Sequence, residues 1–174
     1  SVGMAATAYA KMLGANVVAT TRSEGNVQRL REVGADVAIV DRGRIEEDVR
    51  RAFPEGVDAA LEVVGATTLR DTIKVLKPFG TVTVVGLLGG PPVLENFHLM
   101  QDLPNATRLS FFPSGMLGTA ALPLTDAPLR AIAEGISAGR IPSLRVRTFD
   151  FGDVRQAHAL MESDRVLGKL VVRV

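Results

Sequence analysis

Short strand patterns alternate with helical patterns along this chain, and that alternation constrains the fold more than any other feature. The strand patterns are mostly apolar, and each ends in a glycine or is followed by a proline or a charged residue. They cover residues 16–21, 36–40, 56–65, 81–86 and 106–112. Helical spacing of apolar residues predicts helices at 26–33, 44–53 and 67–76. Because strands that alternate with helices form parallel sheets, we expect an α/β fold.

The first residues indicate a nucleotide-binding βαβ unit. Ser1, Val2 and Gly3 are expected to end a tight turn that leads into a helix of small residues, followed by the strand 16–21. A helix that begins in this way offers backbone N–H groups to a pyrophosphate. We therefore expect a Rossmann-type, doubly wound sheet in the order 3-2-1-4-5-6. Its central first strand would precede Ser1, so we expect the chain to be a piece of a longer protein.

Two further predicted strands end in glycine, at Gly65 and Gly86. In doubly wound sheets the ligand lies across the carboxyl ends of the strands, where glycine lets it approach the backbone. An ordinary turn explains either glycine equally well. Their position at the same expected edge as Gly3 favours a ligand site.

The turn after the strand 16–21 bears on the choice of cofactor. An NAD site places Asp or Glu there to accept hydrogen bonds from the ribose, whereas this chain has Thr21, Arg22 and Ser23. An arginine and a hydroxyl suit the 2′-phosphate of NADP(H). The alternative is that Arg22 is a solvated surface residue.

Composition excludes several kinds of site. The formal net charge of +1 gives no reason to expect a nucleic-acid or anionic-membrane partner. The chain has no cysteine, hence no disulfide and no thiolate zinc site, and its two histidines do not form a metal-binding motif. No signal peptide and no apolar run that could span a bilayer is visible, so we expect a soluble, cytoplasmic protein.

The rest of the chain predicts a cleft loop and a tail. Lys77 to Gly80 are expected to form a turn, and residues 87–104, which lack periodicity, a loop over the ligand cleft. His98 in that loop could reach a ligand. After a boundary near Pro113, the patterns predict helices at 126–137 and 153–162 and extended segments at 144–149 and 169–174.

Several segments, taken in order, carry a family resemblance. They are Ser1-Val2-Gly3, Ala10-Lys11-Met12-Leu13-Gly14-Ala15, Thr20-Thr21-Arg22-Ser23, Glu32-Val33-Gly34-Ala35-Asp36, Leu76-Lys77-Pro78-Phe79-Gly80 and Gly168-Lys169-Leu170-Val171-Val172. A chain with these segments resembles the medium-chain dehydrogenase/reductase superfamily, and most of all its zinc-free quinone oxidoreductase branch. Zinc-dependent and enoyl-reducing members share this half of the protein.

The resemblance implies a division of the chain. Residues 1–114 correspond to an NADP-binding Rossmann domain without its first strand, and residues 115–174 to a tail that returns to a GroES-like substrate domain absent here. The cofactor contacts would be Val2, Gly3, Thr21, Arg22, Ser23, Gly65, Gly86, Leu87 and Phe112. No catalytic residue and no metal ligand is assigned. Where similar proteins carry a lysine, this chain has Asn26, so affinity for the phosphate would depend more on Arg22.

These observations leave three functions open. The first is the NADPH-binding part of an oxidoreductase that transfers hydride to a small quinone, enal or related activated alkene. The second is a non-catalytic NADP-binding sensor or scaffold, and the third is a fragment of a zinc-type alcohol dehydrogenase. Because fold analogy does not determine chemistry, the substrate stays undefined at this stage.

The last predicted strand, 106–112, suggests a homodimer. It would lie at the edge of the sheet, and Arg108 is its only charge, whereas Leu109, Phe111 and Phe112 are strongly apolar. Many members of the superfamily that this chain resembles pair this strand across a two-fold axis. Alternatively, the loop 87–104 or the tail covers the edge within one chain.

Overall fold

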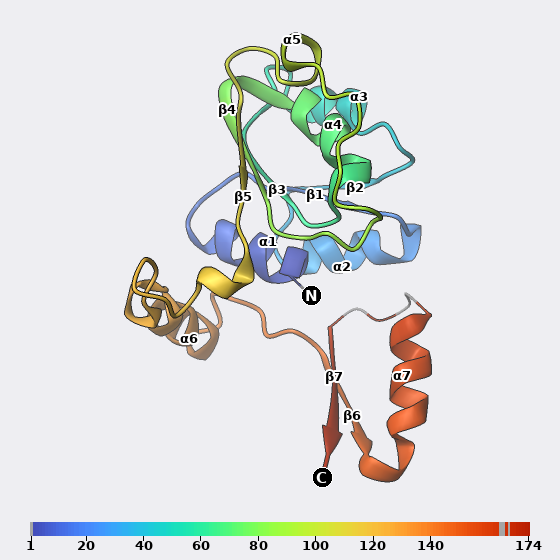
Figure 1. Cartoon of the computed structure of the whole chain (residues 1–174). Helices are drawn as coiled ribbons and strands as arrows, with labels where there is room; N and C mark the ends of the chain where they lie inside the picture. The colour runs from blue at the N-terminus through green and yellow to red at the C-terminus, as the bar shows by residue number, and fades with distance from the viewer. Residues whose placement is uncertain (1, 164–165, 167) are drawn as a thin grey trace.

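Parallel strands and the helices between them form the first two thirds of the chain (Figure 1). We describe residues 2–163, 166 and 168–174 from a computed structural model. The elements are α1 (Val2–Met12), β1 (Val18–Thr21), α2 (Val27–Glu32), β2 (Val37–Val40), α3 (Glu46–Ala52), β3 (Val57–Glu62), α4 (Ala66–Lys74), β4 (Leu76–Val84), α5 (Leu99–Asp102) and β5 (Arg108–Phe111). The predicted order of strands and helices is confirmed except for α5, which lies in the segment 87–104 that was predicted to be a loop.

The five strands form two parallel sheets. β1 pairs with β2, from Val18 opposite Val37 to Thr21 opposite Val40. β4 lies between β3 and β5 and is parallel to both. Among the described residues, β1 and β3 are not hydrogen-bonded to each other. That junction is where the sequence analysis places the first Rossmann strand, which stays a prediction.

Helices cover both faces of the β1–β2 pair. On one face, Met4 and Ala8 of α1 and Leu30 of α2 pack with Ala19 of β1 and Ala38 of β2. A second apolar cluster contains the alternate strand residues and α3: Val18, Val37, Ile39, Ile45, Val49, Val57 and Val75. Successive strand residues point to opposite faces, so α1 and α2 lie on one side and α3 on the other. This arrangement confirms the doubly wound α/β fold.

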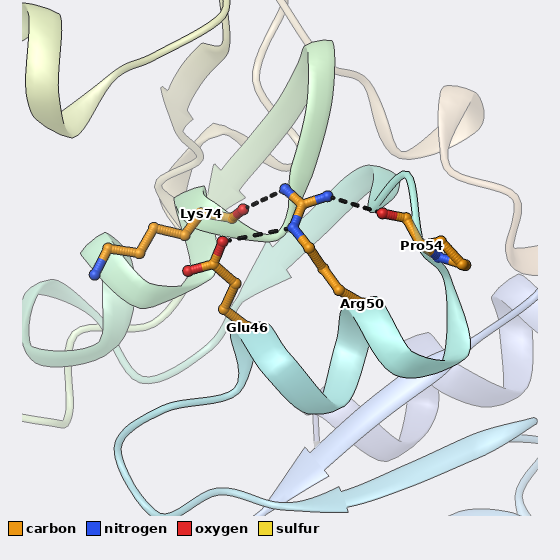
Figure 2. A network of polar contacts seen from close by, with 4 residues as sticks. All are labelled: Glu46, Arg50, Pro54 and Lys74. Atoms are coloured by element: carbon orange, nitrogen blue, oxygen red, sulfur yellow. Dashed lines mark hydrogen bonds and ion pairs between the residues drawn. The ribbon is translucent and has the colours of Figure 1, made fainter.

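Arg50 of α3 joins α3 to the end of α4 (Figure 2). Its Nη2 donates to the carbonyl of Lys74, the last residue of α4, at 2.9 Å, and its Nη1 to the carbonyl of Pro54 at 3.4 Å. Glu46, one turn earlier on α3, accepts from Arg50 Nε at 3.5 Å. The guanidinium thus satisfies a carbonyl that the end of a helix leaves unpaired.

The predicted start of β4 is wrong, because the strand begins at Leu76 and not at residue 81. The expected turn of Lys77 to Gly80 lies inside β4 as an irregularity in its pairing with β3. Phe79 adopts a φ of 63°, which interrupts the regular ladder. The predicted turn is therefore wrong, because the pairing of Leu76 with Val57 extends the strand across these residues.

Other predicted boundaries also differ from the structure. β3 ends at Glu62 and β4 at Val84, so Gly65 and Gly86 follow these strands and do not end them. Val2 and Gly3 belong to the first turn of α1 and do not precede it. β5 begins at Arg108 rather than at residue 106, because Asn105 and Ala106 adopt φ values of 59° and 55°, which a strand excludes.

The tail contains α6 (Leu129–Ser137), β6 (Val146–Asp150), α7 (Val154–Glu162) and β7 (Lys169–Arg173). α6 packs on α1, since a Cβ placed on its buried Gly135 would lie 2.8 Å from Met12 Sδ. The parallel pair of β6 and β7, with α7, lies apart from the main sheets (Figure 1). A boundary near residue 114 and a GroES-like partner for this unit stay predictions.

Candidate functional site

The parallel strands β3, β4 and β5 have their carboxyl ends at one edge of their sheet, and the start of α1 lies near that edge (Figure 1). Val2 is 60% exposed, and a Cβ on Gly3 would lie 3.9 Å from Val63, directly after β3. The first N–H groups of a helix have no partner within it. The structure therefore brings Val2 and Gly3 to the predicted edge, where those N–H groups can serve an anion.

The turn after β1 is held by the hydroxyl of Thr21. Thr21 Oγ1 accepts hydrogen bonds from the backbone N–H of Ser23 at 3.2 Å and from Asn26 Nδ2 at 3.3 Å. Both Arg22 and Ser23 are exposed. Asn26, which the sequence analysis treated only as a missing lysine, thus fixes the turn that presents Arg22.

An ion pair next to this turn was missed by the sequence analysis. Arg42, two residues after β2, donates from Nη2 to Glu24 Oε1 at 2.8 Å, and both side chains are 77% exposed. The strand order could have predicted this ion pair, because β1 and β2 are parallel neighbours and the residues that follow them lie side by side.

Gly65 and Gly86 are explained by contact between two backbone segments. Gly65 has a φ of 120°, and a Cβ there would lie 3.0 Å from the carbonyl oxygen of Gly86. A Cβ on Gly86 would lie 1.9 Å from the carbonyl oxygen of Val63. The loop after β4 therefore crosses directly over the loop after β3. Both glycines lie at the predicted edge, and their contact with a cofactor stays a prediction.

Glu62, at the end of β3, is a buried carboxylate that sequence reasoning missed. It is 4% exposed, and its Oε1 accepts from the backbone N–H groups of Val64 at 2.7 Å and Gly65 at 3.1 Å. Its Oε2 accepts from Thr72 Oγ1 of α4 at 2.6 Å. Glu62 therefore fixes the loop that Gly86 crosses. An acid at the end of a largely apolar strand, three residues before a glycine, was the available signal.

An apolar hollow of about 210 Å³ lies beside this crossing. Its lining includes Leu87, Pro92 and Leu94 of the loop and Phe111 of β5. Phe112 follows β5, and its backbone N–H donates to the carbonyl of Val84 at 2.9 Å. Leu87 is thus brought to the predicted edge, and Phe112 lies beside the end of β4.

The expectation that the whole segment 87–104 covers the cleft is wrong. Its first part does lie there, because the N–H of Gly89 donates to the carbonyl of Val64 at 2.9 Å. The segment then follows α4, where Arg70 binds Asp102 at 3.0 Å, and it forms α5 at the opposite edge (Figure 1). His98 precedes α5, so it does not lie in the cleft.

The charged side chains at that opposite edge hold α5 in place. The backbone N–H of His98 donates to Asp102 Oδ2 at 2.7 Å. This hydrogen bond, with help from Arg70, holds the pKa of the Asp102 carboxyl below its usual value.

Within the described residues, no group of three or more acidic or histidine side chains is placed to hold a metal ion. No helix among the residues that the structure describes is long and apolar enough to cross a membrane.

Comparison with known proteins finds a family model that matches most of the chain. Residues 1–121 match the family model described as zinc-binding dehydrogenase. The 2-haloacrylate reductase of a Burkholderia species is 24% identical over 94% of this chain and 50% of its own length. The chain spans about half the length of the curated relatives it matches.

Two solved structures share the fold. The quinone oxidoreductase of Pseudomonas syringae pv. Tomato matches 99% of this chain and 53% of its own, with a TM-score of 0.83 and 18% identity. A mycobacterial protein complexed with NADPH matches 100% of this chain and 53% of its own, with a TM-score of 0.81 and 23% identity.

Proposed function

Because the chain belongs to the zinc-binding dehydrogenase family, we propose that it is the NADPH-binding part of an oxidoreductase acting on an activated alkene or a quinone. The resemblance to the medium-chain dehydrogenase/reductase superfamily is confirmed. Relatives named as a 2-haloacrylate reductase and a quinone oxidoreductase support this substrate class. Membership of a dehydrogenase family supports a nicotinamide cofactor.

The turn after β1 is the observation that carries the choice of NADPH. Thr21, Arg22 and Ser23 place no carboxylate where an NAD site would bind the ribose hydroxyls. The one acid that follows, Glu24, is paired with Arg42. An exposed arginine held by an ordered turn can donate a forked pair of hydrogen bonds to a phosphate.

The residues at the carboxyl edge have separate roles in this proposal. The backbone at Val2 and Gly3 would bind the pyrophosphate, and Arg22 with Ser23 the 2′-phosphate. Leu87 and Phe112 would lie toward the nicotinamide. When bound, NADPH supplies a hydride from C4 of its nicotinamide, and this chain binds and orients it.

The cofactor assignment is tested by replacing Arg22. In the protein as its gene encodes it, Arg22→Glu should weaken NADPH about tenfold to a hundredfold, since it removes a charge-assisted contact and adds a like charge. Binding of NADH should change far less. Arg130→Glu, the same charge change on exposed α6, is the matched control. Equal losses for both cofactors in calorimetric titrations would refute the phosphate assignment.

The reaction class is tested by a substrate screen. NADPH oxidation should be stimulated by quinones, enals or 2-haloacrylate. Oxidation of simple alcohols with NADP⁺, dependent on added zinc, would instead assign a zinc-type alcohol dehydrogenase. Binding of NADPH without turnover of either class would favour a sensor or scaffold.

We propose further that the free edge of β5 pairs with a second copy of the chain. All four residues of β5 are exposed, and Phe111 is 53% exposed. Arg108, its only charge, donates to Thr81 Oγ1 and to the carbonyl of Phe79, which draws it over the sheet. Among the described residues, β5 is the last strand of its sheet and pairs only with β4. A strand without central charge suits antiparallel pairing about a two-fold axis.

Proline substitution tests this pairing. The N–H of Phe112 points to β4, so by alternation the N–H of Ser110 also points to β4 and that of Leu109 to the free edge. Leu109→Pro should therefore convert a dimer to a folded monomer, whereas Ser110→Pro should destabilise the sheet itself. Light scattering that finds the unchanged protein monomeric at high concentration would end the proposal.

A further inference from the structure

The ion pair of Arg42 and Glu24 lies beside the turn assigned to the 2′-phosphate, and this inference rests on that proposed function. Thr21 pairs with Val40 at the ends of the adjacent parallel strands β1 and β2. The carbonyl of Thr21 accepts from the N–H of Asp41 at 2.7 Å, which carries the pairing one residue further. The residues that follow β1 therefore lie next to Arg42, and Glu24 Oε1 binds Arg42 Nη2 at 2.8 Å.

A ligand can replace Glu24 as the partner of Arg42 at little cost in stability. Both partners are 77% exposed, and an ion pair so open to solvent contributes little stability because water screens it. A phosphate monoester carries close to two negative charges at neutral pH, against one for Glu24. It also accepts the two parallel donors of a guanidinium. A 2′-phosphate at this turn can therefore outcompete the carboxylate for Arg42.

Glu24 needs this partner if the turn is to accept a phosphate. It lies two residues after Arg22, and a bare carboxylate there would repel the ligand and compete for the same cations. In the structure Arg42 neutralises it. The nearby arginine of α2, Arg29, is instead bound to Glu32 at 3.0 Å. Arg42, paired with Glu24, is a cation whose position and partner suit an exchange.

We propose that Arg42 is a specificity-determining residue for NADPH, which exchanges its bond to Glu24 for a bond to the 2′-phosphate. Glu24 then acts as an internal competitor that holds the guanidinium in place before the cofactor binds. The exchange adds a second arginine, from the loop after β2, to the one that the loop after β1 supplies. It also predicts opposite effects for removing the two members of one ion pair.

Calorimetry with 2′,5′-ADP and 5′-AMP tests this in the protein as its gene encodes it, without turnover. Arg42→Gln should weaken 2′,5′-ADP about tenfold, and Glu24→Gln should tighten it severalfold. Neither should alter 5′-AMP, which lacks the 2′-phosphate. The matched controls are Arg173→Gln and Asp150→Asn, which open an exposed pair of 2.9 Å between β7 and β6 and should change neither ligand.

Three results would overturn the inference in distinguishable ways. If Arg42→Gln leaves 2′,5′-ADP unchanged while Arg22→Glu weakens it, the exchange is wrong and the proposed function stands. If neither arginine matters, the phosphate assignment itself fails. If Glu24→Gln weakens 2′,5′-ADP, Glu24 assists binding and is no competitor. Circular dichroism and the melting temperature should stay unchanged in all variants, because every substituted side chain is at the surface.

Discussion

The loops after β1 and after β3 lie at the same edge of the molecule, yet they are built in opposite ways. The loop after β3 surrounds the buried carboxylate of Glu62 and is crossed by the backbone at Gly86. The loop after β1 is polar and exposed, and the hydroxyl of Thr21 supports its turn. One loop is determined by the protein's own packing, and the other is open to a ligand.

This difference changes what a glycine or a polar residue at a strand end signifies. Glycine there permits close approach, but the approaching group can be another backbone segment, as Val63 is for Gly86. Exposed polar side chains on an ordered turn are a better indication of ligand binding, because folding alone does not require them. Substitutions in the two loops should therefore separate stability from cofactor binding.

The largest expected effect is that of Gly86→Ala. The new Cβ would lie 1.9 Å from the Val63 carbonyl oxygen, so backbone must move, and we expect a loss of roughly 3 kcal/mol or more in the free energy of unfolding. Gly25→Ala, in the loop after β1, meets only Ser23 Oγ at 3.7 Å and should change stability by less than about 0.5 kcal/mol. Equal losses in urea denaturation would contradict the comparison.

Glu62→Ala should have the next largest effect. It leaves the N–H groups of Val64 and Gly65 without their acceptor inside the protein, at a cost of about 2–3 kcal/mol. Glu62→Gln keeps an acceptor for these groups and should cost less. Glu24→Ala, in the exposed loop, is the matched control and should be nearly neutral. Thermal melts of the three variants would show whether burial decides the cost.

Thr21→Val should affect binding more than stability. It removes the acceptor for Ser23 and Asn26, with a cost of about 1 kcal/mol, and frees the turn that presents Arg22. We expect the preference for NADPH over NADH to fall, while Thr21→Ser, which keeps the hydroxyl, should retain it. An unchanged preference in the valine variant would show that the turn needs no such support.

The smallest effect is expected at the amino edge, where no ligand is proposed. Lys11 Nζ binds Asp36 at 2.6 Å, and this bond, with the N–H of Val17, lowers the pKa of Asp36. Because the pKa of Asp36 is lower in the folded state, its ionised form stabilises the fold at pH values above the unfolded pKa of about 3.9. This stabilisation is lost as the pH falls through the folded-state pKa. Lys11→Met should therefore cost under about 1 kcal/mol at pH 7, and less at pH 3. Cofactor binding should not change.

Local patterns predicted the elements well and the contacts between them poorly. The spacing of Val27, Leu30 and Val33 indicated α2, and the apolar runs indicated the strands. β4 was placed too late, since Leu76 is a strand residue only through its pairing with Val57. Thr72, the side-chain partner of Glu62, and Glu24, the partner of Arg42, lie 10 and 18 residues away in sequence, beyond the reach of local spacing. The turn Thr21 to Ser23 was found because its chemistry is contained in adjacent residues.

The most direct test of the account is the ratio of dissociation constants for NADH and NADPH, measured by calorimetry on the unchanged protein as its gene encodes it. An arginine-lined turn that binds the 2′-phosphate predicts that NADPH binds at least about tenfold more tightly, and that the ratio falls as salt is raised. Equal affinities, or tighter binding of NADH, would contradict the claim that the turn after β1 selects the cofactor.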